Sequence, residues 1–180
     1  MLFLFVETFR SQVQIKSFKV PLHYKTDNVK LMLNGAAMRV QYNFDIYIGA
    51  LYLVKPNSNS EEILNADEPM CMRIIIASNL VTAERLQESI DDGFRRSTNG
   101  NTLPIQQKIN FLKSAFNDKI KKRDDYQIVY EPGKGSSVYK NKEHILTIPG
   151  YEFKKALFGI WLSKNAAAFE LKEMLLKHQN

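Results

Sequence analysis

An arginine that stands inside an apolar stretch is the residue of this chain best placed to do chemistry. Arg39 lies between Met38 and Val40, in a segment that we expect to be a largely covered strand. A guanidinium keeps its charge at physiological pH, so its burial demands a carboxylate, a phosphate or a similar partner. That partner is either an internal acid such as Asp45 or the carboxylate of a ligand, with a tyrosine hydroxyl completing the contact. The residues alone leave both interpretations open.

Other patterns that could carry chemistry favour structural roles. The segment 133–137 has the sequence Gly-Lys-Gly-Ser-Ser, which lacks the earlier glycine of a phosphate-binding loop and precedes a strand, so it predicts a tight turn. The histidines His23, His144 and His178 have no ligand-type spacing with cysteines or acids, so we predict neither a metal site nor a cofactor. The single cysteine, Cys71, lies in an apolar run and is predicted to be a buried thiol. No residues are arranged as a Ser-His-Asp or Cys-His triad, so no catalytic residue is assigned.

Two long strands between residues 30 and 55 must position Arg39. From Ile46 to Val54 apolar residues occupy both alternating sets of positions, which predicts a central strand covered on both sides. Further strands are expected over 70–77, 126–130, 136–140 and 144–148. Apolar periodicity and capping residues predict helices over 61–66, 82–94, 105–116, 150–162 and 167–177. This order of elements predicts an α+β fold, with helices packed on one face of a mostly antiparallel sheet.

Length and charge limit the classes of function. A chain of 180 residues fits one domain with a sizeable core. The net charge of +6 favours an anionic partner only weakly. Its densest cluster consists of Lys119, Lys121, Lys122 and Arg123, at the end of a predicted helix, where cations complement the helix dipole and cap carbonyls. Because aromatic residues do not alternate with these cations, we do not expect a nucleic acid as partner.

Two segments far apart in the sequence resemble the chalcone isomerase-like domain of bacteria. The first is Leu-Asn-Gly-Ala-Ala-Met-Arg over 33–39, which continues through 47–53. The second is Glu-Pro-Gly-Lys-Gly-Ser-Ser over 131–137, followed by 147–153 and 156–162. The resemblance implies an open-faced β-sandwich of the chalcone isomerase type, with a ligand cleft between sheet and helices.

The same resemblance bears on the N-terminus. Many such bacterial proteins carry an export signal there, so residues 1–16 are interpreted as an N-terminal extension, a truncated or degenerate signal, and 17–180 as the domain. The protein would then be periplasmic, and otherwise cytoplasmic. No stretch reaches the roughly 18 apolar residues of a membrane span, so no integral membrane segment is expected.

The resemblance also names candidate ligand-binding residues. Fatty-acid-binding relatives of chalcone isomerase hold the carboxylate with an arginine and a tyrosine on these two strands, which implies that Arg39 and Tyr47 bind the ligand. True chalcone isomerases also polarise a ketone through threonine, tyrosine and asparagine side chains. The positions that match those donors hold Leu86, Gly93 and Ile160, so the resemblance favours binding over catalysis.

Three functions follow from these observations. The leading hypothesis is a non-catalytic binding protein for a small amphipathic carboxylate, with a fatty acid as the expected ligand. The alternative is a chalcone isomerase-type intramolecular lyase acting on an enone or phenolic substrate, and the third is a structural or partner-binding protein with Arg39 in an internal salt bridge. At helical spacing, Phe153, Leu157, Phe158 and Trp161 are expected in the core or along an apolar tunnel.

Overall fold

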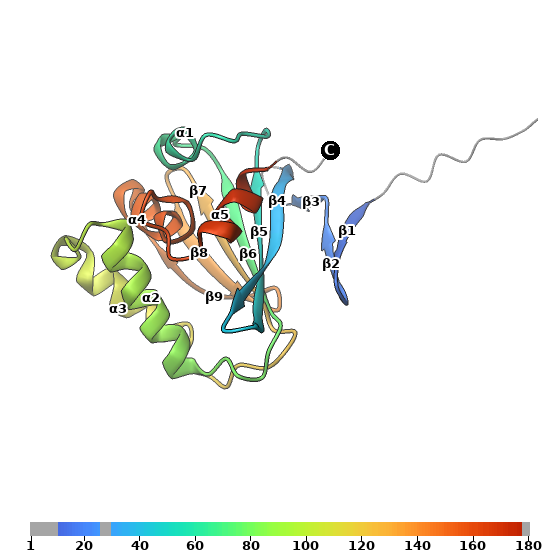
Figure 1. Cartoon of the computed structure of the whole chain (residues 1–180). Helices are drawn as coiled ribbons and strands as arrows, with labels where there is room; N and C mark the ends of the chain where they lie inside the picture. Colours follow the sequence, from blue (N-terminus) through green and yellow to red (C-terminus); the bar gives the residue numbers. More distant parts are fainter. Residues whose placement is uncertain (1–10, 26–29, 178–180) are drawn as a thin grey trace, which may run out of the picture.

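One antiparallel sheet with helices on one of its faces forms the body of the protein (Figure 1). A computed structural model of the chain describes residues 11–25 and 30–177. The sheet has seven strands in the order β3-β4-β5-β6-β7-β8-β9, so each strand pairs with its neighbours in the sequence. These strands are β3 (His23–Lys25), β4 (Lys30–Gln41), β5 (Phe44–Leu53), β6 (Met70–Ile76), β7 (Asp125–Glu131), β8 (Gly135–Lys140) and β9 (Glu143–Ile148). The predicted α+β class and the one-sided helix layer are confirmed.

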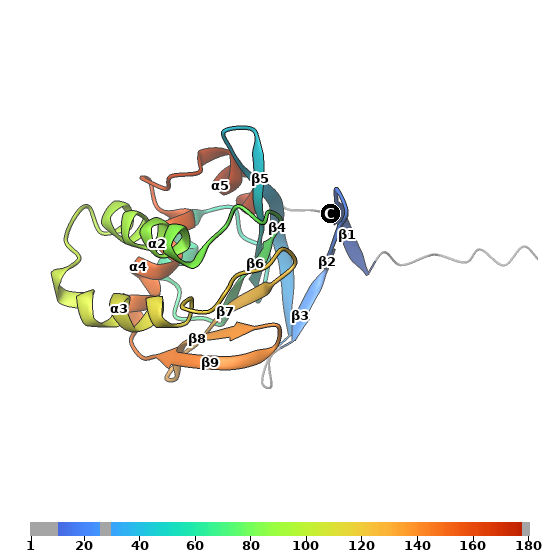
Figure 2. The same cartoon turned by 90° about the horizontal axis from the view of Figure 1, so that it is seen from below.

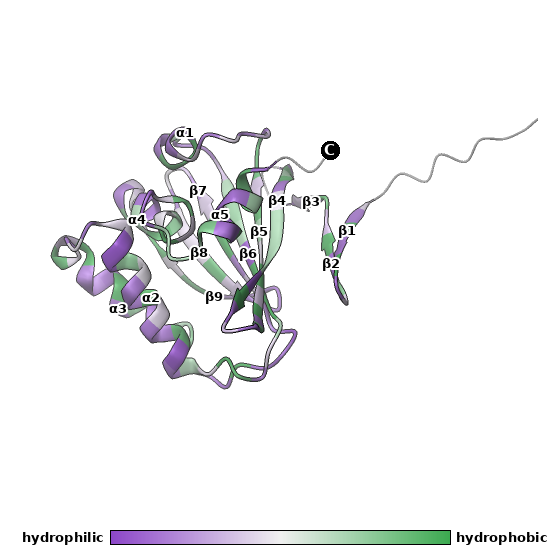
Figure 3. Cartoon of the chain, viewed as in Figure 1, coloured by the Kyte–Doolittle hydropathy of each residue, from purple (hydrophilic) through white to green (hydrophobic). Residues whose placement is uncertain are grey.

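The helices of the described residues lie on the same side of this sheet (Figures 1 and 2). They are α1 (Ser60–Asn65), α2 (Ala83–Ser97), α3 (Gln106–Ser114, preceded by the 3-10 turn Leu103–Ile105), α4 (Tyr151–Leu162) and α5 (Phe169–Leu176). The helix α2 begins after Thr82, whose hydroxyl accepts a hydrogen bond from the Arg85 amide, as the sequence predicts. Bands of hydrophilic and hydrophobic residues alternate along α2 (Figure 3), as expected for a helix with one packed face. None of the helices in the described part of the chain is long and apolar enough to cross a membrane.

The strand β5 is covered on both faces, as its sequence predicts. Leu51 belongs to the hydrophobic core between sheet and helices, whereas Ala50 and Tyr52 belong to a second cluster on the opposite face. All three side chains are fully buried. Because side chains alternate along a strand, burial on both faces requires a layer on each side of the sheet.

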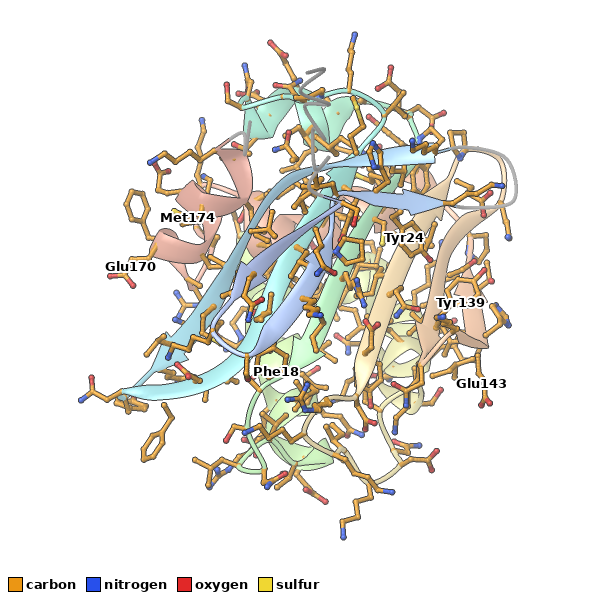
Figure 4. All side chains as sticks on the ribbon, turned by 90° about the vertical axis from the view of Figure 1, so that its right-hand side faces the viewer. Phe18, Tyr24, Tyr139, Glu143, Glu170 and Met174 are labelled. Carbon is orange, nitrogen blue, oxygen red and sulfur yellow. The ribbon has the colours of Figure 1, made fainter. Side chains whose placement is uncertain are left out.

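The second layer is a hairpin that the sequence analysis does not predict. Its strands, β1 (Gln12–Ile15) and β2 (Phe18–Pro21), pair with each other and lie across the face opposite the helices (Figure 4). Phe18 and Val20 are buried against that face, and the Tyr52 hydroxyl donates to the Pro21 carbonyl at 2.9 Å. The strand β1 falls within the segment 1–16 assigned to an extension; residues 1–10 lie outside the described residues, and the export interpretation stays a prediction.

The segment 33–39 fastens the C-terminal helix to the sheet. A register shift separates Leu33 from Gly35, and the Asn34 carboxamide donates to the carbonyls of Asn57 and Leu175 at 2.9 and 2.8 Å. A Cβ atom at Gly35 would lie 2.1 Å from the carbonyl oxygen of Met174. Only glycine therefore lets the end of α5 approach β4 this closely.

Two local predictions from the sequence are confirmed. The segment 133–137 forms the turn from β7 to β8, in which Glu131 pairs with Gly135 and both Gly133 and Gly135 have positive φ angles. Cys71 has no exposed surface, and burial raises the pKa of its thiol. The segment 133–137 is therefore a tight turn and not a phosphate-binding loop, and the Cys71 thiol has no access to solvent.

The basic cluster lies elsewhere than predicted. The helix α3 ends at Ser114, because Phe116 and Ile120 turn into the core, so residues 119–123 form part of the loop to β7. This loop is bonded to the end of β6: the Arg123 amide donates to the Ile76 carbonyl at 2.8 Å. The predicted helix-capping role of the cluster is therefore wrong.

The helix α4 carries a lysine that is completely buried. The Lys154 ammonium donates to the carbonyls of Ile63, Leu64 and Ala66 at 3.1, 2.9 and 2.7 Å, and so caps the C-terminal end of α1. Burial lowers its pKa to about 8, because the charged form loses hydration. The hydrogen bonds of Lys154 thus join α1 to α4, although removing its charge from water is unfavourable.

This arrangement makes the stability of the protein depend on pH through Lys154. We expect Lys154→Met to lower the free energy of unfolding at neutral pH by about 1–3 kcal/mol, because three carbonyls lose their donor. The pKa of Lys154 is about 8 in the folded state, against 10.5 for a freely solvated lysine, so between these values the unfolded chain binds more protons. The stability advantage of the wild type over the variant should therefore grow as the pH rises from about 8 to about 10.5. Urea denaturation of both proteins across this range tests it, and a constant difference would contradict the assignment.

Candidate functional site

A cavity lies between the sheet and the helices. Its volume is about 800 Å³. Its walls come from β4, β5, β6 and β7 on one side, and from α2, α3, α4 and the two residues before α5 on the other. Buried apolar side chains form most of its inner wall: Ile76, Ile90, Leu112, Phe116, Ile128 and Leu157. Such a cavity suits a ligand with a substantial hydrocarbon part.

The two residues that the sequence analysis names for ligand binding both line this cavity. Arg39 on β4 and Tyr47 on β5 are directly opposite each other in the strand register. Residues opposite each other in an antiparallel pair point to the same face of the sheet. A guanidinium and a phenol hydroxyl therefore meet on the helix side of the sheet.

Arg39 is less covered than the sequence suggests. It is half-buried, because it lies near the end of β4, where Val40 and Gln41 are exposed. Its Nη1 donates to the Val40 carbonyl at 3.0 Å, and it forms no ion pair with any described residue. Asp45, the expected internal partner, instead accepts from the Lys16 ammonium at 2.6 Å. The guanidinium therefore keeps donors available at the opening of the cavity.

Tyr47 is held in place by the single tryptophan of the chain. The Trp161 indole Nε1–H donates to the Tyr47 hydroxyl oxygen at 3.0 Å, so α4 is bonded to β5 across the cavity wall. Burial raises the pKa of Tyr47, although the bond from Trp161 and the charge of Arg39 act in the opposite direction. The hydroxyl consequently stays protonated at neutral pH. Its own proton has no acceptor among the described residues and can be donated to a ligand.

The three positions that match the ketone-polarising residues of chalcone isomerase also line the cavity. Leu86 and Gly93 come from α2 and Ile160 comes from α4. A Cβ atom at Gly93 would lie 2.7 Å from Ile160 Cγ2, so the two helices meet closely at this point. None of the three side chains can donate a hydrogen bond.

Exposed side chains surround the opening of the cavity. Tyr42 and Phe44 lie at the tip of the β4–β5 hairpin, Leu80 lies in the loop after β6, and Arg85 and Glu88 lie on α2. The Arg85 guanidinium donates to the Leu80 carbonyl at 3.1 Å. The opening thus combines apolar and charged groups. Within the described ranges, no three His, Cys, Asp or Glu residues are grouped so as to hold a metal ion.

Sequence reasoning found the arginine and tyrosine but missed what orients them. Trp161 is predicted only as a core or tunnel residue, and its bond to Tyr47 is not predicted. A buried indole N–H needs a hydrogen-bond acceptor, so the sequence alone indicates that Trp161 has a polar partner. The identity of the acceptor depends on how α4 crosses β5, which the sequence does not reveal.

Comparisons with known proteins agree with this architecture. The family model for chalcone isomerase-like proteins matches residues 12–177. Among solved structures, the crystal structure of a fatty-acid binding protein of Arabidopsis thaliana superposes with a TM-score of 0.69, covering 88% of this chain and 91% of that chain at 14% identity. No curated protein sequence matches this chain. At this identity the structural likeness shows the fold alone, and the predicted chalcone isomerase type of fold is confirmed.

The surroundings of Arg39 predict that it contributes little to folding. We expect Arg39→Ala to change the free energy of unfolding of ligand-free protein by less than about 0.5 kcal/mol, because a half-exposed side chain without an ion pair is lost. Chemical denaturation of delipidated wild type and variant measures this difference. A loss of about 3–5 kcal/mol would instead reveal a buried acid that depends on Arg39.

Proposed function

The chain belongs to the chalcone isomerase-like family, and on this premise we propose that it is a non-catalytic binding protein for a fatty acid. Arg39 and Tyr47 bind the carboxylate, and the cavity between sheet and helices takes the hydrocarbon chain. One solved structure of similar fold is a fatty-acid binding protein, which agrees with this ligand class.

One observation carries the proposal. Two donors with no acceptor for their remaining protons among the described residues, the Arg39 guanidinium and the Tyr47 hydroxyl, face the same apolar cavity from directly opposite strand positions. A carboxylate accepts hydrogen bonds from both groups at once, and hydrogen bonds in which the donor or the acceptor is ionised are roughly twice as strong as neutral ones. The inner wall supplies hydrocarbon contacts and few polar groups, which suits an acyl chain.

The two other functions considered from the sequence have less support. An isomerase of the chalcone type needs donors that polarise a ketone, and Leu86, Gly93 and Ile160 supply none at the matching positions. A structural role for Arg39 needs an internal acid, but Asp45 is paired with Lys16. Binding of a carboxylate uses the donors that are present.

Trp161 provides a direct readout of binding, because it is the single tryptophan and lines the cavity. We expect palmitate to change its fluorescence, and Arg39→Met to weaken palmitate binding roughly 10- to 100-fold, since a charge-assisted hydrogen bond is lost. Tyr47→Phe should weaken binding about tenfold. Tyr47→Phe also removes the hydrogen-bond acceptor of Trp161 and so alters its fluorescence directly. The midpoints of the palmitate titrations are therefore compared, and not their amplitudes.

Two controls make this test specific. Arg96→Met makes the same substitution at a residue of α2 that does not line the cavity. Its partner Asp92, which does line it, keeps its ion pair with Arg95, so palmitate binding should be unchanged. Hexadecanol, which has the same chain without the carboxylate, should bind the wild type more weakly than palmitate does. Equal affinity of the wild type and Arg39→Met for palmitate would overturn the proposed head-group contact.

A further inference from the structure

The opening of the cavity is surrounded by apolar side chains that stand in solvent. Tyr42 is 85% exposed, Phe44 55% and Leu80 44%, although all three line the cavity. We call these three residues the mouth patch. They come from the β4–β5 hairpin and the loop after β6, which lie at the lower end of the sheet in Figure 1 and face the viewer in Figure 2. Apolar groups gathered at one opening indicate an interaction surface.

The backbone at Tyr42 is not one that folding alone would favour. The hairpin turns through Tyr42 and Asn43, whose φ angles are +49° and +64°. A turn with two positive φ angles prefers Asn and Gly, and a bulky side chain there is strained. Tyr42 adds almost complete exposure to this strain. Neither the strained backbone nor the exposure of Tyr42 stabilises the fold. Both features indicate that Tyr42 contacts a partner outside the chain.

Cations lie at the same end of the sheet. The loop 117–123 carries exposed Lys119, Lys121, Lys122 and Arg123 against one exposed acid, Asp118. Its backbone is bonded to Ile76 at the end of β6, directly before the loop that carries Leu80. The basic loop therefore adjoins the loop that carries Leu80. The Arg123 guanidinium lies 5.2 Å from the centroid of the Phe18 ring, on the face of the sheet opposite the cavity, so Lys119, Lys121 and Lys122 are the cations available at this end.

We propose that the mouth patch and the basic loop dock the protein on a lipid bilayer that contains anionic lipids. Tyr42, Phe44 and Leu80 enter the interface between head groups and acyl chains, where aromatic residues are favoured. The lysines of the loop 117–123 contact the anionic head groups. The cavity then opens directly onto the bilayer, so an acyl chain passes between membrane and protein without crossing water. This inference rests on the proposed function and names the source of its ligand.

The acids at the opening do not reverse this charge pattern. Glu88 and Asp92 lie on α2, on the helix side of the cavity, and Asp92 is paired with both Arg95 and Arg96. Tyr47, near the start of β5, pairs with Ile76 at the end of β6, and Ile75 pairs with Asp125 at the start of β7, so the hairpin tip and the basic loop lie at the same end of the sheet. The positive side of the opening is therefore the side that carries the exposed aromatic residues.

Flotation with lipid vesicles tests the docking. We expect the whole chain to float with vesicles of phosphatidylcholine mixed with phosphatidylglycerol and to bind vesicles of pure phosphatidylcholine much more weakly. Lys121→Gln and Lys122→Gln should each weaken binding to the mixed vesicles about fivefold. Tyr42→Asn should weaken it about tenfold or more. Because Asn suits a positive φ angle, this variant should keep or gain thermal stability while it loses docking.

Two matched variants serve as controls for the docking surface. Leu103 is as exposed as Tyr42, at 85%, but lies in the 3-10 turn before α3, so Leu103→Asn should bind vesicles like the wild type. Lys55 is an exposed lysine after β5, at the opposite end of that strand from the hairpin tip, so Lys55→Gln should also bind like the wild type.

The outcomes separate this inference from the proposed function. Palmitate binding in solution without any flotation would overturn the docking and leave the proposed function standing. Flotation without palmitate binding would overturn the proposed function and support the docking. Equal flotation with both kinds of vesicle, or unchanged flotation of Tyr42→Asn and Lys121→Gln, would overturn the docking surface. A dimer that Tyr42→Asn abolishes, with no flotation, would assign the mouth patch to a second copy of the chain and also overturn it.

Discussion

The register between β4 and β5 is the constraint on which the candidate site depends. Arg39 and Tyr47 face the same cavity because they are directly opposite in an antiparallel pair. That pairing depends on the two-residue turn at Tyr42 and Asn43 together with the register shift between Arg39 and Val40. A slip of one residue in either strand would turn that side chain to the other face of the sheet. The burial of β5 on both faces opposes such a slip, since it would exchange the residues that pack on the helices for those that pack on the β1–β2 hairpin.

The helix α4 connects this strand pair to the rest of the molecule. Lys154 caps α1 at its one end, Trp161 bonds Tyr47 at its other end, and Leu157 and Ile160 line the cavity between them. One helix thus links the stability of the α1 region to the orientation of the Tyr47 hydroxyl, which is proposed to bind the ligand. The desolvated ammonium of Lys154 is tolerated because three carbonyls replace its lost water.

The same fold that closes the cavity at the helices leaves it open at one end of the sheet. Glycines allow the close approaches, at Gly35 beneath α5 and at Gly93 beside Ile160, so the helix layer packs tightly there. At the hairpin tip none of the helices α1–α5 covers the sheet, and apolar side chains of the strands and loops remain exposed. The opening of the proposed ligand cavity and the proposed membrane contact therefore lie at the same end of the molecule.

The sequence by itself determined most local elements after residue 30, the class of fold and the two candidate ligand-binding residues. Strand alternation, the Thr82 cap and the turn at 133–137 depend on neighbouring residues, and neighbours in the chain are what a sequence displays. The family-typical segment 33–39 likewise pointed to Arg39 before any contact was known.

Only the tertiary structure decided the partners of these residues. Arg39 proved half-buried and unpaired with Asp45, Trp161 reached Tyr47 across 114 positions of the chain, and the basic cluster 119–123 proved to be a loop rather than a helix end. The physical reason is that burial, pairing and cavity shape depend on where distant elements pack, and a side chain cannot select its partner until the sheet and the helices have been placed together.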